Sequence, residues 1–335
     1  MRSLSDFRNG KPGFYPDQSI YAEFASAEFG LVFQEASAGA GLVFLVTSPA
    51  KRIWFGAGRC SWYPQNNATA SSLATDKYFA NTILQHAGIP TLGGEYFFLH
   101  DRHRAHRTEG HERSDAMDYF RTLQGAAFVK PLTGSRGDFA QAIHDEALLN
   151  GYLDEVLRYY DSVLMQPVFS GREYRIFLLD DDVVYCARKH QPAVVGDGVR
   201  SLRDLLAEHD AALRQRGVSE AALTTDHGDP DAVPAKGERW TIAGRMNLSA
   251  GGTMVLEAPG PERAAFALAR EARQALGLRV AAVDLFTDIG GDPEAIRLIE
   301  VNANPSIRFL EQCDRPDLIL KIWRHTFSAM GLLGV

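Results

Sequence analysis

Hydrophobic residues along the chain gather in short runs, and turns rich in glycine, proline and polar residues separate these runs. Residues 41–48 and 52–58 are two such runs and predict buried strands, whereas the polar stretch 63–72 predicts a loop. We therefore expect residues 1–75 to form a small α/β lobe.

The rest of the chain alternates between helical and strand-like spacing, with glycine and proline at the predicted ends. Residues 192–209 predict a strand, a Gly-Asp-Gly turn and a helix in succession. The other predicted helices cover residues 76–90, 146–160, 261–277 and 315–330. The other predicted strands cover residues 94–99, 126–131, 162–169, 172–179, 182–188, 278–288 and 296–302.

Composition narrows the function classes. The chain has 335 residues, 45% of them hydrophobic and 23% charged, with a net charge of −7, which argues against a nucleic-acid-binding protein. No apolar run reaches the length of a membrane span, and the N-terminus lacks the apolar core of a signal peptide. The three cysteines, Cys60, Cys186 and Cys313, are scattered, as in a reducing compartment. We expect a cytoplasmic protein with no membrane or nucleic-acid partner.

The segment 100–115 contains four histidines among arginines and acidic residues. A metal site is one interpretation of this composition. A solvated loop is the interpretation that the density of charge favours.

The hairpin predicted at 279–302 carries a candidate metal site. Glu300 and Asn302 are two residues apart on one strand and therefore face the same side, and Asp284 interrupts an apolar run on the partner strand. Two carboxylates and an amide oxygen suit Mg²⁺, with Mn²⁺ as an alternative. The competing interpretation pairs these acids with nearby arginines as ordinary sheet residues.

Upstream segments contain the groups that a nucleotide site needs. Lys130 ends an apolar strand, and the turn 133–137 after it contains Gly134, Ser135 and Gly137, whose backbone could approach phosphates. The turn lacks the order of a P-loop, and glycine turns are common. Glu173 could accept ribose hydroxyls and its neighbour Arg175 could bind a phosphate or carboxylate, or the two could form a cross-strand ion pair.

Several motifs occur together in a fixed order: "FVKPLTGSRG", "QPVFSGREYRIF", "VVGDG", "NLSAGG", "VDLF" and "IEVNANPS". Over roughly residues 76–310 the chain resembles the ATP-grasp superfamily of carboxylate–amine ligases, most of all the ATP-grasp parts of cyanophycin synthetase and fused bacterial glutathione synthetase. The resemblance implies an ATP-grasp α/β (α+β) fold: a pre-ATP-grasp lobe at 1–75, an ATP-grasp domain at 76–335 and a lid at about 120–190. It also implies ATP, Mg²⁺, small carboxylate and amine substrates and, more weakly, a homodimer.

The resemblance also implies roles for individual residues. Arg245 and Lys130 correspond to catalytic positions, and Asp284, Glu300 and Asn302 to metal ligands. The nucleotide-binding positions are Lys77, Lys130, Gly134, Ser135, Gly137, Gln166 and Glu173. The positions on the substrate side are Arg175, Asn247, Ser249, Gly251, Gly252 and Asn304.

Some features depart from the family pattern. Asn81 stands where many relatives have a second lysine, and Gln166 stands where an acid is frequent. We expect no counterpart here of the partner domains of the two fused enzymes, so their substrates do not transfer. Arg175, Arg245 and Arg308 indicate a substrate that carries a carboxylate, or else are solvated surface residues. A small-molecule kinase and a nucleotide-binding scaffold without turnover are the alternative functions.

Overall fold

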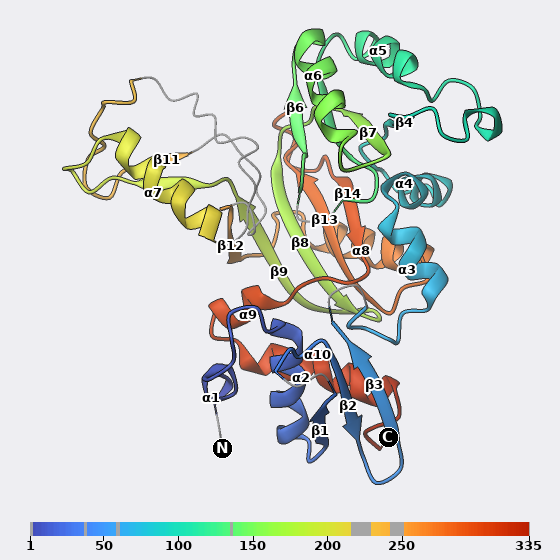
Figure 1. The fold of residues 1–335 in the computed structure, drawn as a ribbon, viewed down its shortest axis with the longest axis vertical. Coiled ribbons are helices and arrows are strands. Elements are labelled where there is room, and N and C mark those ends of the chain that lie inside the picture. The colour runs from blue at the N-terminus through green and yellow to red at the C-terminus, as the bar shows by residue number, and fades with distance from the viewer. Residues whose placement is uncertain are drawn as a thin grey trace.

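The computed structural model describes residues 3–36, 39–57, 61–134, 137–215, 229–241 and 251–334 (Figure 1). Four of the predicted site residues therefore lie outside the described residues: Ser135, Arg245, Asn247 and Ser249. Among the described residues, no helix combines the length and the apolar character that crossing a membrane requires.

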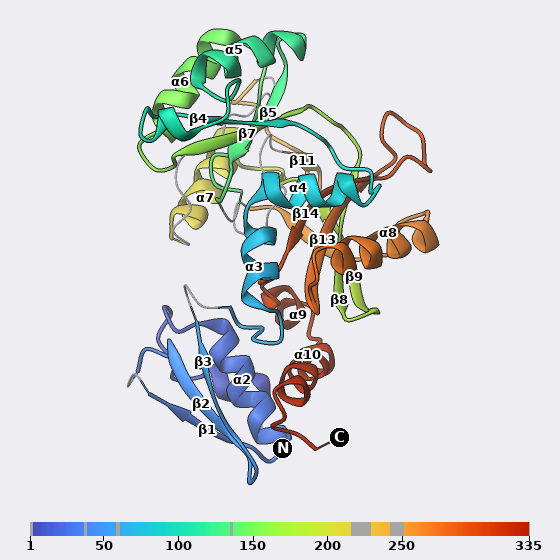
Figure 2. The same cartoon turned by 90° about the vertical axis from the view of Figure 1, so that its right-hand side faces the viewer.

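An antiparallel sheet of five strands, in the order β12-β9-β8-β13-β14, forms the centre of the molecule. These strands are β8 (Arg172–Leu179), β9 (Asp182–His190), β12 (Thr253–Leu256), β13 (Val280–Thr287) and β14 (Arg297–Asn302). Figure 2 shows helices α3 (Ala68–Thr75), α4 (Lys77–His86) and α8 (Glu262–Ala275) against one face of this sheet. Small residues such as Ala265, Ala269 and Ala272 let α8 pack closely on that face.

A second antiparallel sheet, called the small sheet below, lies at one end of the central sheet and has the strand order β4-β7-β5-β6. Its strands are β4 (Glu95–Phe98), β5 (Ala127–Pro131), β6 (Gln141–Ile143) and β7 (Ser162–Pro167), and α5 (Arg113–Thr122) and α6 (Glu146–Val156) share its core. This sheet does not coincide with the expected lid range of about 120–190. Strand β4 precedes that range, and β8 and β9 within it belong to the central sheet, because their apolar residues pack there.

The N-terminal lobe contains a three-stranded sheet with β1 (Val32–Glu35), β2 (Val43–Thr47) and β3 (Arg52–Gly56), together with α1 (Leu4–Arg8) and α2 (Asp17–Glu28). The C-terminal α9 (Arg308–Gln312) and α10 (Pro316–Ala329) return to this lobe (Figure 1). Trp323 and Phe327 of α10 make edge contacts with the ring of Phe55 in β3. The lobe is thus built from both ends of the sequence.

A smaller unit projects from the central sheet and contains β10 (Ala193–Val195), α7 (Leu202–Gln215) and β11 (Arg239–Thr241). Val194, Leu202 and Leu205 form its core.

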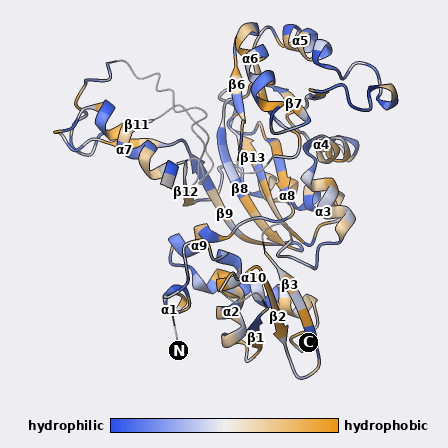
Figure 3. Cartoon of the chain, in the orientation of Figure 1, coloured by the Kyte–Doolittle hydropathy of each residue, from blue (hydrophilic) through white to orange (hydrophobic). Residues whose placement is uncertain are grey.

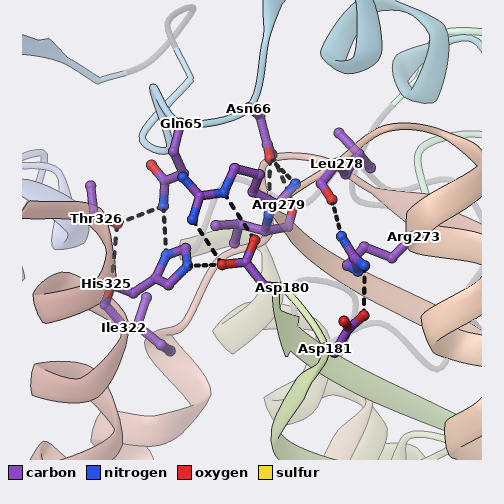
Figure 4. Close-up of polar contacts among 11 residues, drawn as sticks. Gln65, Asn66, Asp180, Asp181, Arg273, Leu278, Arg279, Ile322, His325 and Thr326 are labelled. Carbon is purple, nitrogen blue, oxygen red and sulfur yellow. Dashed lines mark hydrogen bonds and ion pairs between the residues drawn. The ribbon is translucent and has the colours of Figure 1, made fainter. Parts of the chain in front are cut away.

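Polar contacts join the C-terminal helix to the central sheet (Figure 4). Asp180, at the turn between β8 and β9, accepts hydrogen bonds from Arg279 at 2.8 and 2.9 Å and lies 2.8 Å from Nε2 of His325. Arg279 and His325 hold the pKa of Asp180 well below its usual range. Asn66 donates to the carbonyls of Val280 and Ala303 and accepts from two backbone N–H groups, so a single amide ties the 61–67 loop to β13 and the end of β14.

Most predicted elements are confirmed, and Figure 3 shows the hydrophobic colour following the central strands. The loop predicted at 63–72 is wrong from residue 68 onward: α3 begins there, capped by Asn67, whose side chain accepts from the Ala70 N–H at 2.8 Å. Helices α2 and α5 were not predicted.

Candidate active site

The candidate site lies on the part of the central sheet nearest the small sheet. Side chains alternate along each strand, so Glu173 and Arg175 of β8 share a face with Asp284 of β13 and Glu300 of β14. Asp284 is the direct cross-strand partner of both Arg175 and Glu300. The hairpin predicted from the sequence therefore brings together Asp284 and Glu300 as expected.

Asp284 is fully buried and is held by two cations. Arg175 donates from Nε at 2.8 Å and from Nη2 at 2.7 Å, one bond to each carboxylate oxygen, and Lys189 Nζ donates to Oδ2 at 2.8 Å. Burial opposes the charged form, but Arg175 and Lys189 together hold the pKa of Asp284 below its usual range. The competing interpretation, an acid paired with cations, therefore describes Asp284, and its partners are Arg175 and Lys189.

Lys189 was not among the predicted site residues. It extends from β9, is 5% exposed, and also forms an ion pair with Glu173. Burial lowers its pKa, but the nearby carboxylates of Asp284 and Glu173 raise the pKa above its ordinary value. The available signal was a lysine on the same face of β9 as Tyr185 and Ala187, both of which are buried.

Glu300 and Asn302 are joined by a hydrogen bond of 3.2 Å from the Asn302 amide to Oε1 of Glu300. Carboxylate and amide oxygens are the donors that a hard divalent cation prefers, so the chemistry of the predicted ligands fits Mg²⁺. Both oxygens of Asp284, however, are occupied by cations, and no group of three acidic, histidine or cysteine side chains within the described ranges is arranged to hold a metal. Asp284 would have to exchange these partners for a metal.

Two lysines approach the charged residues of the central sheet from elsewhere in the fold. Lys130 of β5 is 5% exposed, and its backbone pairs with Leu164 of β7. Burial lowers its pKa, although Glu300, Glu173 and Asp284 oppose this effect. Lys77, the first residue of α4, donates to the carbonyl of Gly134 at 2.6 Å, and burial lowers its pKa to about 8. The structure thus brings Lys77 to Gly134 of the predicted glycine turn, and it brings both lysines near Glu300.

Gln166 lies on β7, opposite β5. Its Nε2 donates to the carbonyl of Gly93 at 2.6 Å, whereas its buried Oε1 has no partner within the described residues. The chain approaches closely here: a Cβ on Gly94 would lie 2.5 Å from the carbonyl oxygen of Met165. The amide of Gln166 is therefore fixed with its oxygen available as an acceptor.

The other predicted residues are more dispersed. Gly137 and Gly251 both adopt positive φ, and Gly251 and Gly252 directly precede β12, the neighbour of β9. Asn304 accepts from the Trp62 N–H at 2.9 Å, which places it beside the N-terminal lobe. Arg308 is exposed and lies 3.6 Å from Asp17 in that lobe, away from the cluster.

The histidine-rich segment forms no metal site within the part of the chain that is described. His111 stacks on Tyr96 with ring centroids 4.1 Å apart, and His100 lies 3.3 Å from Asp161. These contacts attach the segment to β4 and to Asp161, the residue before β7.

The arrangement of sheets has a counterpart among solved structures. The match to the bifunctional glutathione synthetase from Pasteurella multocida covers 97% of this chain and 44% of the chain of that enzyme, with a TM-score of 0.53 and 18% sequence identity. The chain has the ATP-grasp fold, as the sequence predicted.

Sequence relatives agree with this result. The glutathione biosynthesis bifunctional protein GshAB of Desulfotalea psychrophila is 28% identical over 252 residues, which are 69% of this chain and 31% of that protein. Cyanophycin synthetase of Trichormus variabilis is 26% identical over 264 residues, 70% of this chain and 27% of that protein. No family profile matches the sequence. The predicted resemblance is confirmed, and the chain spans about a third or less of these relatives' length.

Proposed function

We propose that this protein is an ADP-forming, ATP-dependent carboxylate–amine ligase that joins an amino acid or small peptide to an amine. The observation that carries this proposal is the cluster of buried charges where the two sheets meet. Lys130 is 5% exposed and its ammonium interacts with the carboxylates of Glu300, Glu173 and Asp284. A buried ammonium in this position is a ready binding group for phosphate.

The nucleotide would bind between the small sheet and the central sheet. Lys77 and Lys130, with the turn that contains Gly134, Ser135 and Gly137, would hold its phosphates. Glu173 would accept hydrogen bonds from the ribose. The free Oε1 of Gln166 would accept from the adenine amino group, which an amide can do as well as the acid that is frequent in relatives.

Asp284, Glu300 and Asn302 are the groups that would hold Mg²⁺ or Mn²⁺, and the metal would offset the negative charge of the phosphates. Arg245 and Arg175 would bind and orient the substrate carboxylate. The substrate side would be completed by Asn247, Ser249, Gly251, Gly252 and Asn304.

The proposed reaction has two steps. The substrate carboxylate attacks the terminal phosphorus of ATP and ADP leaves; the amine nitrogen then attacks the acyl carbon, phosphate leaves and the nitrogen loses a proton. The cations of the cluster stabilise the charge that moves in both steps. Because the acyl phosphate hydrolyses in water, we propose that the small sheet acts as a lid. The division at residue 75 and a homodimer stay predictions.

The test is phosphate release from Mg·ATP with the twenty amino acids, singly and in pairs, with mass spectrometry of the products. We expect release that needs an acid and an amine together, with a condensed product. Lys130→Met should reduce release at least about 100-fold, whereas Lys321→Met, an exposed lysine paired with Asp182, should not change it. A phosphorylated single substrate that accumulates would instead identify a kinase.

A further inference from the structure

Lys189 is a buried cation to which the resemblance assigns no role. Its ammonium lies between Glu173 and Asp284 and contacts both carboxylates. Together with Arg175 it occupies the two oxygens of Asp284, the residue that the proposed function assigns to the metal. A cation of the protein thus stands where a divalent cation is expected.

The formal charges around Lys189 oppose a metal that arrives alone. The cationic side chains are Lys130, Arg175 and Lys189, and the acidic ones are Glu173, Asp284 and Glu300. Three positive charges against three negative ones leave no net charge. A divalent cation added alone to this balanced cluster leaves an excess of positive charge, whereas a nucleotide triphosphate brings the negative charge that offsets the metal.

We propose that Lys189 holds the place of the divalent cation at Asp284 until a nucleotide binds, so that metal and nucleotide bind together. This inference rests on the proposed function. Phosphate oxygens give Lys189 a new partner, and Asp284 then becomes able to ligate a metal. The ion pairs of Lys189 keep the acidic residues paired in the meantime, which avoids the cost of an uncompensated buried charge.

The experiment measures Mn²⁺ binding by electron paramagnetic resonance, with the protein alone and with a non-hydrolysable ATP analogue. For the unmodified protein we expect weak binding alone and much tighter binding with the analogue. Lys189→Met removes the charge and keeps the length of the side chain, and should tighten Mn²⁺ binding to the protein alone by about tenfold or more. Lys189→Arg keeps the cation and should bind Mn²⁺ alone as weakly as the unmodified protein.

Lys321→Met is the matched control, because it removes an equal charge from an exposed ion pair with Asp182. Equal Mn²⁺ affinity of the unmodified protein and Lys189→Met in the absence of nucleotide would overturn the proposal. So would Mn²⁺ binding to the unmodified protein alone that is as tight as with the analogue, a comparison that needs no variant. Lys189→Gln replaces the methionine variant if that variant does not fold.

Failure of the proposed function gives a different result. Binding of the analogue without metal is followed separately by intrinsic tryptophan fluorescence. If the analogue does not bind, the ligase proposal fails. The comparison of Mn²⁺ binding between the unmodified protein and Lys189→Met, both without nucleotide, still decides whether Lys189 prevents the metal from binding.

Discussion

Replacing Asp284 with asparagine tests the charge cluster by its effect on stability. The variant keeps the shape of the side chain and removes the carboxylate that accepts three hydrogen bonds from Arg175 and Lys189. The side chain of Arg175 is 18% exposed and that of Lys189 is 3% exposed, so water can replace little of the lost contact. Among the described residues, Glu173 is then the one acid in direct contact with Lys189. Leaving a buried cation without its partner costs about 3–5 kcal/mol of unfolding free energy.

The assay is urea denaturation followed by fluorescence and circular dichroism, which also tests whether the chain unfolds in one step. With an m-value of about 3–4 kcal/mol/M, the expected loss lowers the urea midpoint by about 1 M. Adding Lys189→Met to Asp284→Asn should recover at least about 1 kcal/mol, because it removes one of the unpaired cations.

The control is Asp182→Asn. Asp182 pairs with Lys321 at 2.6 Å, but its side chain is 56% exposed, so the change should stay within about 0.5 kcal/mol. A loss below about 1 kcal/mol for Asp284→Asn would refute the reasoning, and so would a double variant less stable than Asp284→Asn alone.

Three further predictions follow from other contacts. Because burial lowers the pKa of Lys77 to about 8, this lysine loses its charge in the folded protein as pH rises through 8. Nucleotide affinity should therefore fall above that pH, and nucleotide binding at pH 8 should take up protons. Calorimetry in two buffers checks this, and Lys77→Met should reduce the proton uptake. Asn66→Ala removes four hydrogen bonds to backbone and should cost about 2–4 kcal/mol in urea denaturation, with exposed Asn150→Ala near zero as control. Gly94→Ala forces a methyl group to within 2.5 Å of the Met165 carbonyl oxygen at φ +109° and should lower both stability and nucleotide affinity. Gly151→Ala, with open space in α6, should instead raise stability by about 0.5–1 kcal/mol. Unchanged nucleotide affinity of Gly94→Ala would contradict a role in nucleotide binding for the contact between Gly94 and β7.

The acidic part of the site was predictable because it depends on local rules. Strand alternation and a single hairpin suffice to bring Asp284 opposite Glu300, and both rules act within about twenty residues of sequence. The resemblance then added Lys77 and Lys130, whose proximity to the acids depends on how two sheets meet.

Lys189 was not predictable in the same way. Lys189 reaches Asp284 because β9 and β13 flank β8 on opposite sides and the lysine side chain extends across β8. This order of strands is a property of the whole fold. Helix α3 was missed because its sequence is rich in threonine and serine, which have modest helix propensity. It forms because Ala70 and Ala74 pack against the central core, a contribution from tertiary structure.

The return of α10 to the N-terminal lobe has a consequence for how the chain folds. One core contains Tyr21 and Phe55 from the beginning of the sequence and Ile319, Trp323 and Phe327 from its last helix. During synthesis, α2 can pack on the first sheet at once, but the contacts from α10 form only after that helix has left the ribosome. Contacts between such distant residues form slowly, and apolar surface exposed in the meantime promotes aggregation. The N-terminal lobe is therefore among the last parts of the chain to complete its core. Its folding should depend on chaperones more than the folding of the small sheet, whose core closes within residues 97–165.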